Sequence, residues 1–247
     1  MKAYTVKSPS FLSSEGFTLV ELLITMLVSG IIMAGVYTAY LSQQRMYTAQ
    51  EQVVEMQQNI RAAMDMITRG IRMAGYDPLR SASSGFLRAD IGRIGFSQDI
   101  EGDGDLDDPG EFVYYGFSLL DDNDRNGIPD AVVNGVHDAR PLRVRLNNSN
   151  ANDDPNEAIA DNIQAIEFLY LDAAGNPTVA LADIRLVQVS ILARTALPDP
   201  QYTNNLTYTP ASGVPWDLNG AAPGNAANDN FRRRLLITTV QCRNMGL

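Results

Sequence analysis

The stretch Gly16-Phe17-Thr18-Leu19-Val20-Glu21, with the apolar run that follows it to about Ala39, decides how this chain is organised. Glu21 is the only charged residue among the 24 residues of segment 17–40. As a helix this segment would span roughly 36 Å, which is enough to cross the roughly 30 Å apolar core of a bilayer. An ionisable group is costly there, so Glu21 marks a function and needs a partner. Cleavage after Gly16 would create that partner, the amine of Phe17.

The residues before the apolar run indicate the orientation of the chain. Segment 1–16 is polar, carries Lys2 and Lys7, and has no apolar stretch of its own. In a secretory signal peptide the apolar stretch comes before the cleavage position, whereas here it comes after Gly16. The positive-inside rule then places the leader in the cytoplasm and the bulk of the chain outside. A buried core helix is the alternative, but the length of the run and the polar leader argue against it.

Composition excludes several functions. The formal charge is −10, so the surface repels phosphate backbones and nucleic acid is not an expected partner. The single cysteine, Cys242, cannot form an intramolecular disulfide, and the single histidine, His137, has no second histidine to complete a zinc site. The sequence shows no Ser/His/Asp set, no cysteine–histidine pair and no phosphate-binding glycine loop. We therefore expect no catalytic residues, no enzyme activity and no required cofactor.

Apolar residues continue at helical spacing beyond the membrane-length run. Steps of three and four residues separate Met46, Ala49, Val53, Met56, Ile60, Ala63, Ile67, Ile71 and Ala74. Charged and amide side chains stand between them, so one face is apolar and the other is polar. Gly75 and Pro78 then end the pattern. The sequence predicts one helix over 17–74, roughly 87 Å long at the standard rise. Its second half suits either a coiled coil or packing on a sheet.

The remainder of the chain predicts strands between polar loops. Runs rich in β-branched and aromatic residues cover 111–119, 142–146, 165–171, 184–194 and 235–242. Helices do not alternate with these strands, so the fold class is α+β, with an antiparallel sheet packed on the long helix. Two long surface loops are expected, over 147–161 and over 198–230, and the second has the composition of a mobile loop.

The N-terminal residues carry a specific resemblance. Glycine, then phenylalanine, then glutamate four residues later, before an apolar helix and behind a short basic leader, resembles the class III leader of type IV prepilins and type II secretion pseudopilins. The resemblance implies that a membrane-embedded peptidase cuts after Gly16 and N-methylates Phe17. It also implies that Glu21 pairs with the Phe17 amine of a neighbouring subunit. Such a pair neutralises two charges in an apolar filament core and fixes the register of adjacent helices.

More of the chain is similar to the PilW-type minor pilins, which are related to the J-type pseudopilins. The similar segments are 67–76 at the end of the helix and 231–244 at the end of the chain. The resemblance implies a type IV pilin-like fold divided into a leader peptide, a filament-core helix, an amphipathic helix half and a β-rich head, over residues 1–16, 17–40, 41–76 and 77–247.

The same resemblance implies a role and a set of partners. The role is that of a minor pilin in a tip or priming complex, which supports adhesion or twitching motility. The partners are other minor and major pilins, the prepilin peptidase, the assembly platform and the inner membrane. The head is expected in the periplasm before assembly and at the cell surface afterwards. A J-type minor pseudopilin of a type II secretion system shares every N-terminal feature and remains the alternative.

Two acidic segments share the spacing of calcium loops. In both, oxygen-bearing side chains alternate and a glycine stands at the sixth position, which resembles EF-hand, dockerin and thrombospondin repeats. The first set is Asp99, Glu101, Asp103 and Asp107, and the second is Asp122, Asp124, Asn126 and Asp130. Gly110 and Val133 stand where an EF-hand has its bidentate glutamate, so the expected sites are weak and structural. A solvated acidic loop with Asx turns is the alternative for both.

Overall fold

The computed structural model describes residues 16–220 and 226–246, so most of the predicted leader, residues 1–15, lies outside the described residues. The chain divides into two compact units, Met1–Thr48 and Ala49–Leu247. One helix, α1 (Leu19–Met73), contributes to both. Each unit is described by itself.

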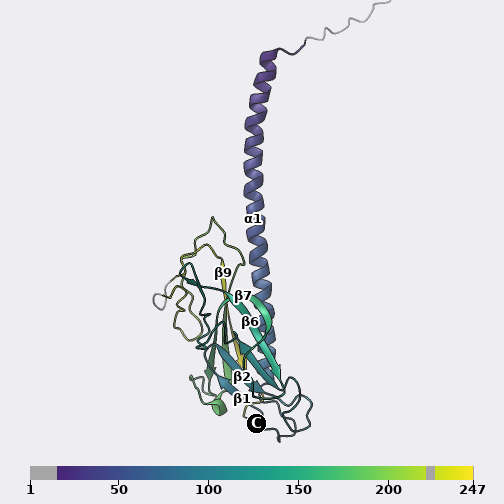
Figure 1. Cartoon of the computed structure of the whole chain (residues 1–247), viewed down its shortest axis with the longest axis vertical. Helices are drawn as coiled ribbons and strands as arrows, with labels where there is room; N and C mark the ends of the chain where they lie inside the picture. The colour runs from purple at the N-terminus through teal and green to yellow at the C-terminus, as the bar shows by residue number, and fades with distance from the viewer. Residues whose placement is uncertain (1–15, 221–225, 247) are drawn as a thin grey trace, which may run out of the picture. The chain divides into compact units, whose positions relative to one another are not determined.

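The first unit consists of the N-terminal part of α1 (Figure 1). The helix begins at Leu19 rather than at the predicted Phe17, because Thr18 occupies the position before it and bonds to Glu21. Apolar side chains of this part are exposed, from Leu19 (75%) to Tyr40 (58%). By length and composition α1 could cross a membrane.

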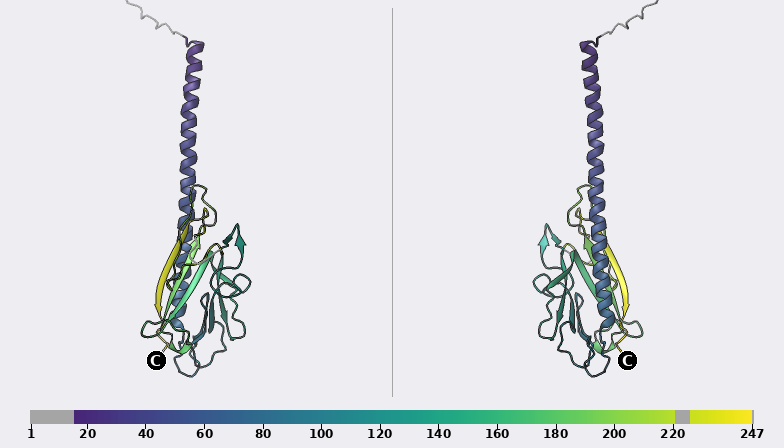
Figure 2. Two further views of the ribbon diagram at one scale, coloured as in Figure 1. Left: turned by 90° about the vertical axis from the view of Figure 1, so that its left-hand side faces the viewer. Right: turned by 90° about the vertical axis from the view of Figure 1, so that its right-hand side faces the viewer.

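The second unit contains the remainder of α1 and a single curled sheet. In the described part of this unit, seven strands form an antiparallel sheet in the order β1-β2-β3-β6-β7-β8-β9, and β4 and β5 form a separate hairpin (Figures 1 and 2). The strands are β1 (Phe86–Ala89), β2 (Arg93–Ser97), β3 (Phe112–Gly116), β4 (Val132–Val133), β5 (Val136–His137), β6 (Arg140–Asn147), β7 (Glu157–Leu171), β8 (Leu186–Arg194) and β9 (Arg233–Gln241), with a short 3-10 helix, η1 (Leu181–Asp183). The predicted α+β architecture is confirmed.

One face of the sheet packs on α1. The predicted apolar stripe is buried from Met56 to Ala74, where Ile60, Ile67 and Ile71 are 0–1% exposed. These side chains share one core with alternate residues of the strands, such as Ile166 of β7 and Ile191 of β8. The sheet, rather than a coiled-coil partner, therefore covers this half of the helix. The stripe fails only at its start, because Met46 is exposed.

The opposite face of the sheet carries a second, smaller core. Ala165 and Leu192, which are paired across β7 and β8, pack with Trp216 and Leu218 from the long segment after β8. The buried Glu167 accepts hydrogen bonds from the Ser212 backbone and hydroxyl at 3.0 and 2.7 Å. The segment predicted as a surface loop therefore forms a layer over this face, and the described part of it contains buried anchors.

Several predicted boundaries were wrong. Strands β1 and β2 were not predicted, and the strand predicted over 165–171 begins at Glu157, inside the expected loop 147–161. The first part of β7 pairs with β6 through two register shifts, which keeps an acidic, Asn-containing stretch extended. Tertiary pairing has overridden the low strand propensity of these residues.

Candidate assembly motif and cation-binding loops

Glu21 takes part in a capping box at the start of α1. Thr18 donates to Glu21 Oε2 from its backbone N–H, at 3.1 Å, and from its hydroxyl, at 3.0 Å. In return the Glu21 N–H donates to Thr18 Oγ1, at 3.2 Å. This reciprocal arrangement satisfies backbone donors that a helix start leaves unpaired. A single subunit thus holds the carboxylate at the first turn, close to the position where cleavage would create the Phe17 amine.

The role of Thr18 was missed in the sequence. The spacing Thr-x-x-Glu before an apolar run is itself a signal of a helix start, and it predicts the pair that the structure contains. Phe17 is 87% exposed, and a Cβ added to Gly16 would meet nothing within 4 Å. The peptide bond between them is therefore accessible in the described structure.

The second acidic loop brings three carboxylates together. Among the described residues, the group whose ligand atoms could hold a metal ion is Asp122, Asp124 and Asp130, with oxygens within 4.8 Å of one another. Asp122 is buried and the other two are exposed. Asn126, the fourth predicted ligand, directs its Oδ1 to the Ile128 N–H at 2.7 Å, so its oxygen is already engaged. The three predicted carboxylates of this loop therefore converge.

Hydrogen bonds from the loop backbone hold Asp122 in place. Its Oδ1 accepts from the Asn126 N–H at 3.1 Å and its Oδ2 from the Gly127 N–H at 3.0 Å. Burial raises the pKa of Asp122 to about 6, aided by neighbouring Asp124 and opposed by the N–H groups of Gly127 and Asn126. Below about pH 6 Asp122 therefore holds a proton beside its neighbouring carboxylates, and a bound cation would displace that proton.

The same loop docks on the sheet. The Ile166 N–H of β7 donates to the Gly127 carbonyl, and the Gly92 N–H donates to the Arg125 carbonyl, both at 2.8 Å. Arg125 also lies within ion-pair distance of Asp90 and Asp153. The bond to Gly127 pairs the backbone N–H of Ile166, which lies beyond the part of β7 that pairs with β6. An ordered loop therefore completes this edge of β7.

Gly127 tests how closely the loop must approach the sheet. Its φ is +84°, and an added Cβ would overlap the Ile166 carbonyl oxygen. Gly127→Ala should lower the free energy of unfolding by more than about 2 kcal/mol, because backbone strain and overlap act together. Gly135→Ala is the matched control, since its φ is +78° and nothing lies within 4 Å of the added Cβ. It should cost roughly 1–2 kcal/mol. Thermal unfolding of the full chain in detergent measures both, and equal losses would contradict the proposed close docking.

The first acidic loop does not gather its predicted ligands in the same way. Asp99 is fully buried, whereas Glu101, Asp103 and Asp107 are exposed. Among the described residues of this loop, no three carboxylates have oxygens within 4.8 Å of one another, as those of the second loop do. The four predicted ligands of the first loop therefore do not form a single cluster in this structure.

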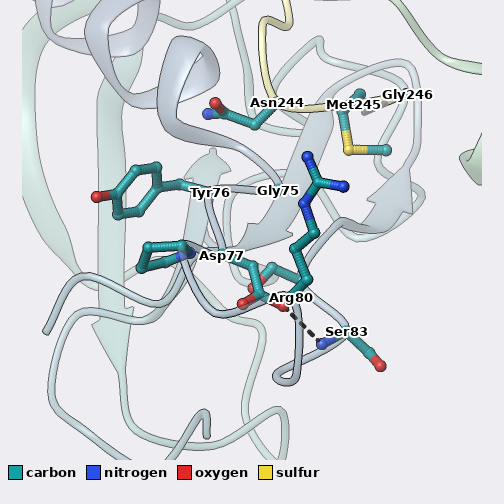
Figure 3. A pocket seen from close by; sticks show the side chains of 10 residues that line it. Gly75, Tyr76, Asp77, Arg80, Ser83, Asn244, Met245 and Gly246 are labelled. Atoms are coloured by element: carbon teal, nitrogen blue, oxygen red, sulfur yellow. Dashed lines mark hydrogen bonds between the residues drawn. The ribbon is translucent and has the colours of Figure 1, made fainter. Parts of the chain in front are cut away.

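A polar cavity lies where α1 ends. It measures about 440 Å³ and is lined by residues 75–78, 80 and 83–84 of the helix end and the following turn, and by 244–246 near the C-terminus. Asp77 holds the turn, because its carboxylate accepts from the N–H group of Ala82 at 2.9 Å. It also accepts from the N–H group of Ser83 at 3.1 Å (Figure 3). Figure 3 shows Arg80 extending from this turn toward Met245.

Comparison with known proteins supports the reading of the N-terminus. Residues 12–37 match the model of the prokaryotic N-terminal methylation motif. The chain carries this motif. A comparison with curated proteins found no match. A type IV-like pilin from Thermus thermophilus is a similar solved structure, with a TM-score of 0.44 and 14% identity over 77% of this chain and 98% of that one. This structural likeness is too low to support an inference about function.

Proposed function

We propose that the chain is a structural subunit of the type IV pilus, a minor pilin that takes part in pilus assembly or priming. The observation that carries this proposal is the methylation motif at residues 12–37, which continues into an exposed apolar helix with one carboxylate. The motif accounts for the leader, and the capped Glu21 supplies a charge that a neighbouring subunit's amine would neutralise. The function is therefore assembly and not catalysis.

The proposed partners follow from this role. The prepilin peptidase would remove residues 1–16 and methylate Phe17. The helix would anchor the chain in the inner membrane, with the second unit in the periplasm, until the assembly platform passes the subunit to other minor and major pilins. Adhesion or twitching motility would follow from the finished filament. PilW-type minor pilins are the proposed subgroup, on the similarity of segments 67–76 and 231–244.

A J-type minor pseudopilin is the second candidate, because the methylation motif suits it equally. A deletion strain separates the two. Loss of surface pili on electron micrographs with normal secretion of exoproteins supports the pilus, and complementation with the wild-type gene is the control. Normal pili with loss of secretion would overturn the first proposal in favour of the second.

We also propose that the loop from Asp122 to Asp130 binds calcium as a structural ion. The converging oxygens of Asp122, Asp124 and Asp130 favour this, since calcium prefers carboxylate and carbonyl oxygens. Bound calcium would order the loop that docks on Gly92 and β7. This loop has Val133 where an EF-hand has its twelfth-position glutamate. We therefore expect a dissociation constant for calcium of about 10⁻⁴–10⁻³ M, as in extracellular modules.

The pH dependence of stability tests this second proposal. An acid whose pKa is raised to about 6 in the folded chain binds more protons there than in the unfolded chain between about pH 4 and 6. Without divalent ions, the Tm of the wild type relative to Asp122→Asn should therefore fall as pH rises through this window. A difference of about two pKa units is worth about 3 kcal/mol. Since about 1 kcal/mol shifts the Tm of a domain of this size by about 2–4 °C, the expected fall is on the order of 10 °C.

Calcium should remove this effect and raise the wild-type Tm at pH 7, because the ion favours the ionised carboxylate. Asp124→Asn removes a ligand of this loop, so it should show a smaller calcium-dependent increase than the wild type. Asp161→Asn is the control, since Asp161 is an exposed carboxylate outside the loop. A wild-type Tm that is unchanged in millimolar calcium would contradict the proposal.

A further inference from the structure

Two fully buried carboxylates lie near the end of α1. Asp99 follows β2 and Glu111 precedes β3, and both are 0% exposed. Among the ion pairs of the described residues, none includes either one. Buried charges in proteins are normally paired with an opposite charge or bound to a metal. Since no described side chain forms an ion pair with either carboxylate, a proton or a cation from outside these side chains must offset their charge.

The Asp99 carboxylate has the geometry of a loop's first ligand. Its Oδ1 accepts from the Gly102 N–H at 2.5 Å and its Oδ2 from the Gly104 N–H at 3.1 Å. Asp122 accepts in the same way from Gly127, which also stands five residues later, at 3.0 Å. In both loops, therefore, the first aspartate accepts a hydrogen bond from the N–H of the glycine five residues later.

Glu111 reaches into this loop from the neighbouring strand and has an oxygen to spare. Its Oε2 accepts from the Asp108 N–H at 3.0 Å, within the loop. Its Oε1 is buried and has no hydrogen-bond partner. Burial raises the pKa of Glu111, the N–H groups of Asp108 and Ile100 lower it, and the charges of Asp108 and Asp99 raise it. Asp99 is therefore one of the charges that act on Glu111.

A second uncommitted oxygen lies beside it. The Gln98 N–H donates to the Glu111 carbonyl at 2.9 Å, so the two residues are opposite each other in the continuation of the β2–β3 pairing. Residues opposite each other in an antiparallel pair place their side chains on the same face. The Gln98 amide donates to the Gly110 carbonyl at 3.1 Å, but its buried Oε1 has no partner. Unpaired buried oxygens of this kind are costly unless something binds them.

We propose that segment 98–111 binds a divalent cation that prefers oxygen ligands, calcium in the first instance, with Asp99 and Glu111 as its two anionic ligands. An EF-hand has its bidentate glutamate at the twelfth position of the loop, where this loop has Gly110. Glu111, the next residue, would supply that carboxylate. A carboxylate pair and a neutral amide oxygen are hard ligands, which suit calcium rather than a thiophilic metal. This site does not depend on the Asp122 loop or on the assembly role.

The ion would fasten the end of α1 to the sheet. The Asp99 N–H donates to the Tyr76 carbonyl at 2.7 Å, and the Ser81 hydroxyl donates to the Gly104 carbonyl at 3.1 Å. Tyr76 and Asp77 belong to the turn that leaves the helix (Figure 3). An ion that orders segment 98–111 would therefore also hold in place the turn that follows α1.

Calorimetric titration of the full chain in detergent with calcium chloride, after removal of divalent ions, tests the proposal. The Asp124→Asn variant removes a ligand of the other loop and should retain one calcium site. Adding Glu111→Gln to it should weaken that site at least about tenfold, the effect of removing even an outer partner of a metal ligand. Adding Glu157→Gln, an exposed carboxylate elsewhere, should leave the affinity unchanged. No calcium binding by Asp124→Asn at millimolar concentration, or equal affinity with Glu111→Gln, would overturn the proposal.

Hydrogen exchange keeps the test decisive if Glu111→Gln does not fold. In Asp124→Asn with Glu111 intact, millimolar calcium should slow amide exchange in peptides that cover 98–111. Peptides from β8 serve as the internal reference. Unchanged exchange over 98–111 would show that no ion binds there and that Glu111 is accommodated as a neutral acid. Loss of calcium binding at Asp122 alone would leave this outcome unaffected, so the two proposals fail separately.

Discussion

The intact mass of the protein purified from its host membranes should correspond to a chain that begins at N-methylated Phe17. The reason is electrostatic, because Glu21 lies in an apolar segment and the amine that can neutralise it exists only after cleavage. Gly16→Val should abolish processing, leaving the whole population with the leader attached. A Cβ added at Gly16 meets nothing within 4 Å among the described residues, so the loss would report on recognition by the peptidase and not on misfolding.

Gly30→Ala provides the matched control for this result. Its added Cβ also has nothing within 4 Å. It lies inside the matched segment 12–37 but far from the peptide bond between Gly16 and Phe17. It should be processed as efficiently as the wild type. Detection of an intact Met1 terminus in the wild-type protein would overturn the assignment of the motif and, with it, the proposed assembly function.

The helix and its partner sheet could be predicted because their signals are local. The apolar stripe from Met56 to Ala74 follows helical spacing, and β8 and β9 each contain several β-branched residues. The unpredicted β1 and β2 are four and five residues long and contain arginine and glycine. They are strands because β3 pairs with β2 along its whole length. Propensity in such short segments is too weak to outweigh tertiary pairing.

The layer after β8 shows what composition cannot reveal. Segment 198–230 is rich in proline, glycine and asparagine, which predicts a surface loop. Trp216 is nevertheless 6% exposed and Leu218 0% exposed, because they cover the second face of β7 and β8. Two apolar residues leave no periodic signal. The presence of a second apolar face on β8, where Val189 and Leu192 face opposite sides, is the feature that requires such a cover.

The two proposed cation-binding loops differ in how far the sequence predicts them. Convergence of Asp122, Asp124 and Asp130 follows from sequence spacing, since the loop closes on itself through Gly127. Glu111 could not be found by that spacing, because strand pairing with Gln98 places it. The EF-hand spacing predicts the last ligand at Gly110 and therefore misses Glu111, which is the next residue.

Glu21→Ala should leave cleavage intact but reduce incorporation into the filament at least about tenfold, since an unpaired charge would remain in the apolar core of the filament. The capping box complicates this substitution, because Glu21 also stabilises the first turn of α1 through Thr18. Loss of a cap costs about 1 kcal/mol, which could itself impair docking of the helix. Two further variants separate the charge from the cap.

Glu21→Gln keeps a side chain of the same shape that can still accept from Thr18, but it removes the charge. It should impair incorporation as severely as Glu21→Ala. Thr18→Val removes the hydroxyl that accepts from the Glu21 N–H and keeps the charge, so it should assemble within a few-fold of the wild type. The ratio of protein in the sheared surface fraction to protein in the membrane fraction, measured by quantitative immunoblotting after intact-mass confirmation of cleavage, gives the result. If Thr18→Val fails as Glu21→Ala does while Glu21→Gln assembles normally, the carboxylate acts only as a helix cap, and the proposed pairing with the Phe17 amine of a neighbouring subunit is wrong.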